Sequence, residues 1–375
     1  MRKLQMVDLL AQYDHIKEEV DQAVLDVVRS SAYINGPEVK SFQAELEQYL
    51  GVKHAIPCAN GTDALQIAMM GLGLQPGDEV ITATFTYVAT AEVIALLGYT
   101  PVLVDVDEDT FQIDPDAVRA AITPKTRAIV PVHLFGQSAP MEEIMAIAEE
   151  HNLFVVEDNA QAIGADYTFS DGRTQKTGTI GHVSGTSFFP SKNLGCYGDG
   201  GCIFTNDDEL ANNLRQIANH GQSVRYYHDQ VGVNSRLDSI QAAILRIKLR
   251  HLDRYNTSRR EAADYYDQAF ADVPQLKIPV RAGGSSHVFH QYTLQLLEGN
   301  RDTFVAELQK NEIPAMIYYP VPLHMQKAYL DDRYNEGSFP VTERLCARVL
   351  SLPMHSELTK EQQNLIINAV KTAIK

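Results

Sequence analysis

The sequence LFVVED at residues 153–158 joins a short apolar run to two acidic residues. A short apolar run rich in β-branched residues predicts a strand that is buried on both faces. Comparable runs occupy residues 79–82, 101–106, 128–132, 184–189 and 201–205, and amphipathic stretches at 63–71, 90–97 and 141–150 lie between them. Strands that alternate with helices predict an α/β fold, in which a mainly parallel sheet is covered on both faces.

The pattern changes after residue 250. A charged helical stretch at 251–269 is followed by loops, a strand-like segment at 290–296 and two further helical stretches. With 375 residues, the chain is long enough for two domains. We predict a large domain over residues 16–250 and a smaller C-terminal α/β domain over 251–375, with an N-terminal arm (1–15) packing nearby.

The charge balance limits the classes of partner. The chain has 48 acidic residues against 32 lysines and arginines, a formal charge of −16. Such a field repels polyanions, so we expect neither a nucleic-acid nor a membrane partner. An anionic small substrate would need local cations and backbone N–H groups.

Other features of composition favour a cytoplasmic protein. The four cysteines form no CxxC pair, which fits a reducing compartment. The first residues lack the apolar segment of a signal peptide, and no apolar run is long enough to span a bilayer. The twelve histidines show no metal-binding spacing, so we predict no metal site.

Lys192 is the first candidate for chemistry. It follows the predicted strand 184–189 and precedes a glycine-rich stretch at 195–201. An apolar setting penalises a charged amine, lowers its pKa and leaves the neutral amine free to react with a carbonyl group. A surface lysine on a turn is the alternative. The glycines form neither a P-loop nor a dinucleotide fingerprint, because no Lys-Ser/Thr follows them and a strand comes next.

Two more stretches carry polar groups at element ends. Asp158 follows a buried strand, where an acid either caps the next turn or acts as a functional carboxylate, and Gln161 could face the same pocket. Residues 60–63 (NGTD) open a helix, whose free N–H groups make either a phosphate seat or an ordinary cap. A phosphate seat, an acid after one strand and a lysine after the next are together typical of fold-type I enzymes that use pyridoxal 5'-phosphate (PLP).

Several stretches also resemble one family. They are residues 59–65, 84–91, 157–161, 187–192 with 198–201, and 233–238. This combination resembles the DegT-type PLP-dependent nucleotide-sugar aminotransferases, and the resemblance covers nearly the whole chain. It implies PLP as cofactor, glutamate as amino donor with 2-oxoglutarate as its product, a nucleotide sugar as acceptor, and a homodimer with shared active sites.

The resemblance implies a role for each matching residue. Lys192 would hold the cofactor covalently, and Asp158 would pair with its ring nitrogen. Tyr87 would stack on the ring, and Gln161 would lie near the ring hydroxyl. The other cofactor contacts would be Gly61, Thr62 and Ser187 at the phosphate, Asp63 beside them in the sequence, and Asn234 from the neighbouring subunit.

The substrate side of the resemblance is narrower. Residues 187–201 and 220–236 look most like the WbpE-like branch, which aminates C3 of UDP-2-acetamido-2-deoxy-3-oxo-glucuronate. The expected substrate contacts are Arg236, Tyr319 and His324. Arginine suits a sugar carboxylate because its planar fork donates two parallel hydrogen bonds. The family has histidine where this chain has Tyr318, so no role carries over to that position.

Other functions stay open. Neighbouring branches act on 4-keto or neutral 3-keto nucleotide sugars with nearly the same cofactor site. Related sugar dehydratases carry histidine in place of the cofactor lysine, and Lys192 argues against that activity. A non-catalytic PLP-binding regulator is the alternative from a different class; the intact Lys192 and Asp158 argue against it. Arg236 could also simply pair with Asp238.

Overall fold

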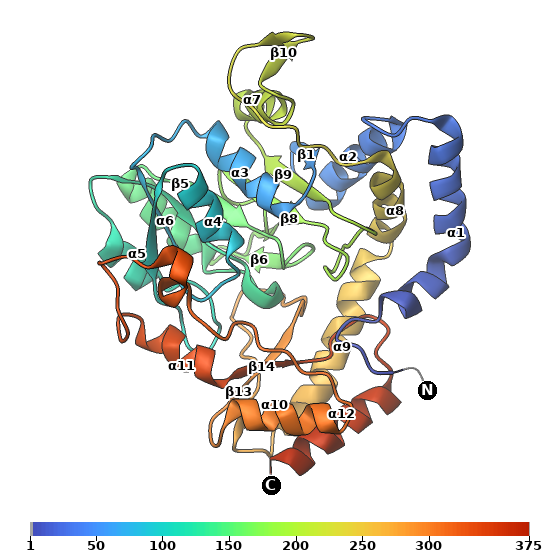
Figure 1. The fold of residues 1–375 in the computed structure, drawn as a ribbon, viewed down its shortest axis with the longest axis vertical. Helices are drawn as coiled ribbons and strands as arrows, with labels where there is room; N and C mark the ends of the chain where they lie inside the picture. Colours follow the sequence, from blue (N-terminus) through green and yellow to red (C-terminus); the bar gives the residue numbers. More distant parts are fainter. Residues whose placement is uncertain (1–2, 375) are drawn as a thin grey trace.

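A mainly parallel sheet forms the centre of the molecule (Figure 1). The computed structural model describes residues 3–374. Within them, seven strands follow the order β1 (His54–Cys58), β9 (Gly201–Thr205), β8 (Val183–Ser187), β5 (Phe154–Asp158), β4 (Thr126–Val130), β2 (Glu79–Ala83) and β3 (Thr100–Val104). Only β9 among these strands runs against its neighbours. The predicted α/β fold is therefore confirmed.

Alternating side chains bury both faces of this sheet. Val80, Val156 and Ile203 pack on one face, against α3 (Gly61–Gly71) and α7 (Asp208–Ala218). Ile81, Ile129 and Val155 pack on the other face, with α6 (Met141–His151). Helices α2 (Pro37–Leu50) and α8 (Ser239–Leu249) cover the end near β1 and β9, while α4 (Ala89–Leu96) and α5 (Pro115–Ala121) lie beside β3. Consecutive residues of each strand thus point to opposite faces of the sheet and pack against different helical layers.

The C-terminal part builds a second, antiparallel sheet. It consists of β12 (Leu276–Lys277), β13 (Tyr292–Leu296) and β14 (Val349–Leu352). The helices α9 (Leu252–Phe270), α10 (Arg301–Lys310) and α12 (Lys360–Ala373) share its apolar core, and α11 (Pro340–Arg348) joins the core of the large sheet. The two-domain division at residue 250 stays a prediction.

The N-terminal segment runs beside this second sheet. Met354 N–H donates to Met6 C=O at 3.1 Å just before α1 (Leu9–Ser30) begins. Residues 1, 2 and 375, which belong to the predicted arm and small domain, lie outside the described residues. No helix in the described part of the chain is both long and apolar enough to cross a membrane.

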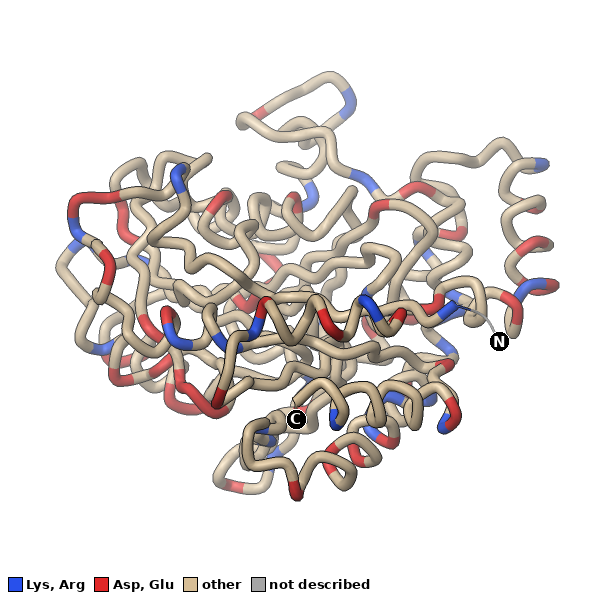
Figure 2. Tube along the Cα trace, turned by 60° about the horizontal axis from the view of Figure 1, so that its bottom comes forward, with Lys and Arg blue, Asp and Glu red and all other residues tan. Residues whose placement is uncertain are grey.

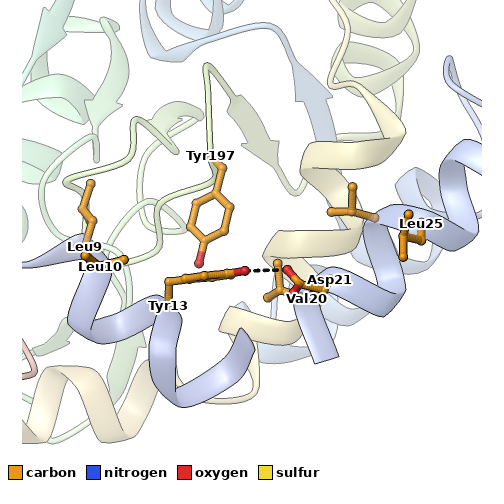
Figure 3. Close-up of a pocket in the computed structure, with 8 residues that line it drawn as sticks. Leu9, Leu10, Tyr13, Val20, Asp21, Leu25 and Tyr197 are labelled. Atoms are coloured by element: carbon orange, nitrogen blue, oxygen red, sulfur yellow. Dashed lines mark hydrogen bonds between the residues drawn. The ribbon is translucent and has the colours of Figure 1, made fainter. Parts of the chain in front are cut away.

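The surface carries mixed charge and two exposed apolar features. Acidic and basic residues are interspersed along the outer helices and loops (Figure 2). A shallow groove lies between α1 and the loop that carries Tyr197, where Tyr13 Oη donates to Asp21 at 2.6 Å (Figure 3). A hairpin of β10 (Gln222–Val224) and β11 (Tyr227–His228) projects from the far side of α7 (Figure 1). A smaller hairpin pairs β6 (Asp166–Thr168) with β7 (Thr174–Lys176).

Candidate active site

A cavity of about 520 Å³ opens beyond the carboxyl ends of β5 and β8, beside the N-terminus of α3. This is the edge of a parallel sheet at which ligands bind. Most of the residues predicted from the sequence meet here. The lining includes Gly61, Thr62, Tyr87, Asp158, Gln161, Ser187, Lys192 and Tyr319, together with Asn60, Ser191, Asp199, His290, Gln291 and Tyr318.

Lys192 lies in the loop between β8 and β9, five residues beyond the end of β8. Two backbone hydrogen bonds close this loop, from Phe188 N–H to Gly200 C=O at 2.7 Å and from Lys192 N–H to Phe189 C=O at 2.8 Å. Among the described residues, Lys192 Nζ has no hydrogen bond or ion pair. Burial in the surrounding protein lowers the pKa of Lys192 to about 8, although the Asp158 charge opposes the shift. A larger fraction of the amine is therefore neutral near physiological pH than for an ordinary lysine.

Asp158 is the last residue of β5 and points to the layer of α3 and α4. Its Oδ2 accepts a hydrogen bond from Thr90 Oγ1 at 2.7 Å, and its Oδ1 accepts one from Ala160 N–H at 3.1 Å. The hydrogen bond from Ala160 N–H is the capping role that was one of the two alternatives for Asp158. The side chain also lines the cavity. The carboxylate is held from both sides and is 5% exposed.

Gln161 is fixed by bonds at both ends of its amide. Its Oε1 accepts from Phe135 N–H at 2.8 Å, and its Nε2 donates to Tyr319 Oη at 3.2 Å. Burial raises the pKa of Tyr319 and keeps its hydroxyl protonated. Tyr87 stands at the cavity with its ring 6.2 Å from that of Tyr319 and is 56% exposed. An aromatic face is therefore left open for a flat ligand.

The start of α3 presents backbone donors to the same cavity. Asn60 Oδ1 accepts from Asp63 N–H at 2.8 Å. The N–H groups of Gly61 and Thr62 have no hydrogen-bond acceptor within residues 3–374. A side chain at Gly61 would place its Cβ 2.6 Å from the Cβ of Ser187, so glycine is what lets the helix start so close to β8. Two free amides and a serine hydroxyl suit a phosphate.

Four predicted contacts lie outside this cavity. Asn234 is exposed and Arg236 half-buried. Arg236 has no ion pair or hydrogen bond within the described residues, so the alternative pairing with Asp238 does not form. His324 is buried, with Nδ1 3.1 Å from Thr84 Oγ1 and Nε2 3.2 Å from Glu343. The fourth contact, Asp63, takes part in the cap described above. Their ligand contacts stay predictions.

Sequence patterns missed His290 and Gln291. His290 lies just before β13, far along the chain from the segments that were predicted to bind the cofactor. Burial, with the Lys192 and Arg259 charges, keeps the pKa of His290 well below its usual value, so the ring is neutral. Its Nδ1 has no hydrogen-bond partner in the described chain. Only a contact between distant segments brings this side chain to the cavity, and no local signal announces it.

These groups fit PLP. The cavity offers an amine of lowered pKa, a fixed carboxylate, an open aromatic face and a phosphate seat that depends on the missing Cβ of Gly61. Together with the mainly parallel sheet, they define a fold-type I PLP-dependent transferase.

Comparison with known proteins narrows the class to one family. Residues 14–371 match the DegT/DnrJ/EryC1/StrS aminotransferase family. The chain is 46% identical over 367 residues to UDP-2-acetamido-2-deoxy-3-oxo-D-glucuronate aminotransferase of Pseudomonas aeruginosa, covering 98% of this chain and 99% of the relative. It is 48% identical over 369 residues to a pleiotropic regulatory protein of Geobacillus stearothermophilus, covering 97% of each.

A solved structure agrees over the full length. The crystal structure of DesV from S. venezuelae, in complex with a ketimine intermediate, superposes with a TM-score of 0.95 at 41% identity, covering 100% of this chain and 99% of that one. The chain belongs to the DegT/DnrJ/EryC1/StrS family and is a PLP-dependent aminotransferase.

Proposed function

We propose that this aminotransferase moves an amino group from glutamate to the C3 ketone of UDP-2-acetamido-2-deoxy-3-oxo-glucuronate. The general activity, amination of a keto sugar carried on a nucleotide, has the support of the family and of the relatives' activities. The observation that carries the catalytic part is the meeting of Lys192 and Asp158 in one cavity. The choice of sugar is supported by the Pseudomonas aeruginosa relative.

Lys192 is proposed as the catalytic residue. PLP, when bound, supplies an aldehyde that condenses with amines and a ring that withdraws electrons from the adjacent carbon. Because burial lowers its pKa to about 8, Lys192 Nζ can take a proton from a substrate carbon and return it at neutral pH. The amine has no hydrogen-bond or ion-pair partner among the described residues, so it is free to move as it takes up and returns the proton.

The remaining cavity residues would hold and orient the cofactor. Asp158, fixed by Thr90, would keep a proton on the ring nitrogen. Tyr87 would cover the ring, and Gln161 would contact the ring hydroxyl. We assign the phosphate to the free amides of α3 and to Ser187, with Asp63 helping to shape the helix start.

A homodimer would complete the site. The cavity of one chain is lined by a single lysine and no arginine, which is little positive charge for a ligand that carries several phosphates. Asn234 and Arg236 do not line that cavity and could serve the site of a partner chain. The projecting hairpin exposes apolar side chains, as an interface would. They are Val224, Tyr226 and Tyr227.

Mixing two inactive variants tests the shared site. Lys192→Ala and Asn234→Ala homodimers should each be impaired. In a hybrid dimer, one site carries both lesions and the other regains both intact residues. Activity should therefore reappear after subunit exchange, because one of the two sites in each hybrid dimer is intact. If hybrids form but stay inactive, Asn234 does not act across the interface.

Arg236 is proposed to bind the carboxylate of the sugar. It is the cation nearest to Asn234 in the sequence, and no described residue neutralises it. Loss of this arginine, which would leave the carboxylate unpaired in a partly desolvated site, should cost roughly 2–4 kcal/mol of transition-state binding.

Arg236→Ala should therefore lose activity selectively. We expect kcat/KM to fall on the 3-keto uronic acid nucleotide and to change little on its neutral counterpart with a hydroxymethyl group. An equal fall on both sugars would make Arg236 a loop residue only. A parent enzyme that prefers the neutral sugar would overturn the uronate assignment itself.

A panel of substrates tests the proposal as a whole. Incubation with PLP, glutamate and keto nucleotide sugars, followed by mass spectrometry, should show amination of the 3-keto uronate above 4-keto and neutral 3-keto sugars. Tyr319 and His324 stay proposed substrate contacts. Because Thr84 and Glu343 occupy the two ring nitrogens of His324, this residue would act on the substrate through these neighbours.

A further inference from the structure

Glu157 belongs to the stretch 157–161 that carries Asp158 and Gln161, but it faces the opposite layer. Successive strand residues point to opposite faces, so Asp158 turns to the cavity and Glu157 turns away from it. Its side chain is fully buried. Nothing in the proposed reaction uses this carboxylate, although burying a charge is costly unless every oxygen is satisfied.

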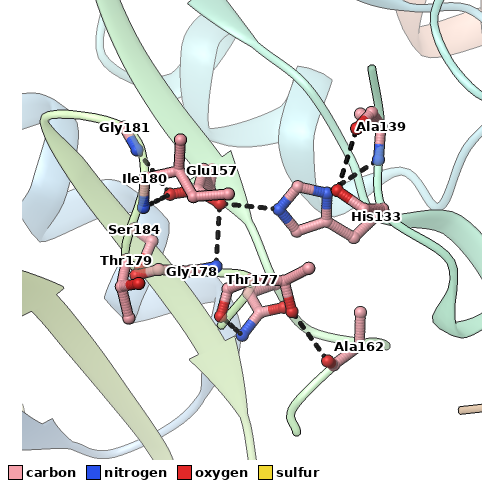
Figure 4. A network of polar contacts seen from close by, with 12 residues as sticks. His133, Ala139, Glu157, Ala162, Thr177, Gly178, Thr179, Ile180, Gly181 and Ser184 are labelled. Atoms are coloured by element: carbon pink, nitrogen blue, oxygen red, sulfur yellow. Dashed lines mark hydrogen bonds and ion pairs between the residues drawn. The ribbon is translucent and has the colours of Figure 1, made fainter. Parts of the chain in front are cut away.

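Four donors converge on Glu157 (Figure 4). Its Oε2 accepts from His133 Nε2 at 2.8 Å and from Gly178 N–H at 2.7 Å. Its Oε1 accepts from Ile180 N–H at 2.7 Å and from Gly181 N–H at 2.6 Å. A protonated carboxyl would set its own O–H against one of these donors, so the arrangement requires the carboxylate anion.

The tautomer of His133 follows from its other contact. Ala139 N–H donates to His133 Nδ1 at 3.1 Å, so Nδ1 carries no proton. Nε2 must then carry the single ring proton and donate it to Glu157. The pair is a neutral imidazole with an anionic carboxylate, and peptide dipoles rather than a cation hold the buried charge.

Both loops that this pair joins reach Gln161. His133 and Ala139 bracket the loop after β4, in which Phe135 N–H fixes Gln161 Oε1 at 2.8 Å. On the other side, Thr177 precedes the three donor amides; its C=O accepts from Asn159 Nδ2 at 3.1 Å and its Oγ1 donates to Ala162 C=O at 2.8 Å. These two bonds bracket the turn that carries Gln161.

We propose that Glu157 and His133 are a positioning pair that sets the Gln161 amide in the cavity. This inference rests on the proposed contact between Gln161 and the cofactor's ring hydroxyl. The carboxylate ties the loop of Phe135 to the loop of Thr177, and these loops hold the turn of Gln161 from two sides. The same loop also meets Asp158, whose C=O accepts from His133 N–H at 3.0 Å.

Glu157→Gln is the sharpest perturbation. It keeps the shape but turns one acceptor oxygen into an NH₂ group, which then faces either His133 and Gly178 or the two N–H groups of 180 and 181. Every orientation sets donors against donors, so the loops must shift. Should this variant fail to fold, His133→Asn serves instead, because it can keep an acceptor near Ala139 while losing the donor to Glu157.

A double-mutant cycle with Gln161→Ala provides the test. We expect each single variant to lower kcat/KM by about 10–100-fold, by analogy with the loss of groups that orient metal ligands. Both should shift, in the same direction, the pH at which the absorption band of bound PLP changes. The double variant should be no worse than Gln161→Ala alone, since one change acts through the other.

A matched control separates positioning from general destabilisation. Thr293→Val removes the buried bond between Thr293 Oγ1 and Ser351 Oγ, 2.9 Å long, in the small sheet. It should lower Tm and leave the PLP absorption titration unchanged. Losses in kcat/KM that add in the double variant, or an unchanged PLP absorption titration in Glu157→Gln, would overturn the proposed positioning pair. The proposed role of Gln161 would be unaffected. A Gln161→Ala variant without effect would overturn the proposed role of Gln161, and the inference with it.

Discussion

Lys192→Ala should abolish transamination and leave the fold intact. The change removes the amine proposed both to hold the cofactor and to move the proton, so the loss should exceed the roughly 10²–10⁴-fold that one acid–base group contributes. The change breaks no hydrogen bond or ion pair, because the amine has no such partner in the described part of the chain. Turnover of glutamate, with circular dichroism as the check on folding, measures both effects.

Lys248 offers a matched control for this variant. Burial lowers its pKa to about 8 as well, but its Nζ donates to Gly195 C=O at 2.5 Å and it does not line the cavity. Lys248→Met should therefore lower stability and still allow transamination. Activity that survives in Lys192→Ala and disappears in Lys248→Met would reverse the assignment of the two amines.

Asp158→Asn should give the second large loss, on the order of 10²–10⁴-fold in kcat. The asparagine can still accept from Ala160 N–H through its oxygen, and its amide can donate to Thr90 Oγ1, so the shape of the site persists. Only the negative charge is removed, and with it the means to keep the ring nitrogen protonated.

Thr90→Val is the control for Asp158→Asn. It removes the hydrogen bond to Asp158 Oδ2 and keeps the charge, so its loss in kcat should be clearly smaller. Steady-state kinetics on glutamate compare the two variants. Near-parental turnover in Asp158→Asn would reduce Asp158 to the cap of the turn at Ala160.

Local patterns in the sequence predicted most of the central sheet. Apolar runs located β2, β3, β4, β5, β8 and β9 to within a few residues, because buried strands in such a sheet are nearly continuous apolar segments. The run at 184–189 ends two residues early in the structure, since the chain already turns at Phe188 to close the loop of Lys192. The antiparallel direction of β9 follows from that loop, which contains no crossover helix.

The site was predictable only where chemistry and local structure coincide. Lys192, Asp158 and the start of α3 each stand at the end of an element, a position that sequence alone can locate. His290 reaches the cavity from the second sheet, and Glu157 meets His133 only because β4 and β5 are neighbours. Strand order and long-range packing decide such contacts, and neither leaves a periodic signal.

The regulator alternative now has a named relative, the Geobacillus stearothermophilus pleiotropic regulatory protein. The cavity of this chain nonetheless combines an available amine with a fixed carboxylate, the two groups that transamination with PLP uses. Turnover of glutamate to 2-oxoglutarate by the purified protein separates the two possibilities.

Borohydride reduction of the PLP-loaded protein identifies the lysine that holds the cofactor. The reagent makes the link between cofactor and lysine permanent, and mass spectrometry of the digested protein then identifies the labelled peptide. The protein should be yellow, lose its colour on reduction and carry the label on Lys192, at about one per chain. A label on Lys248 or Lys176 instead would contradict it.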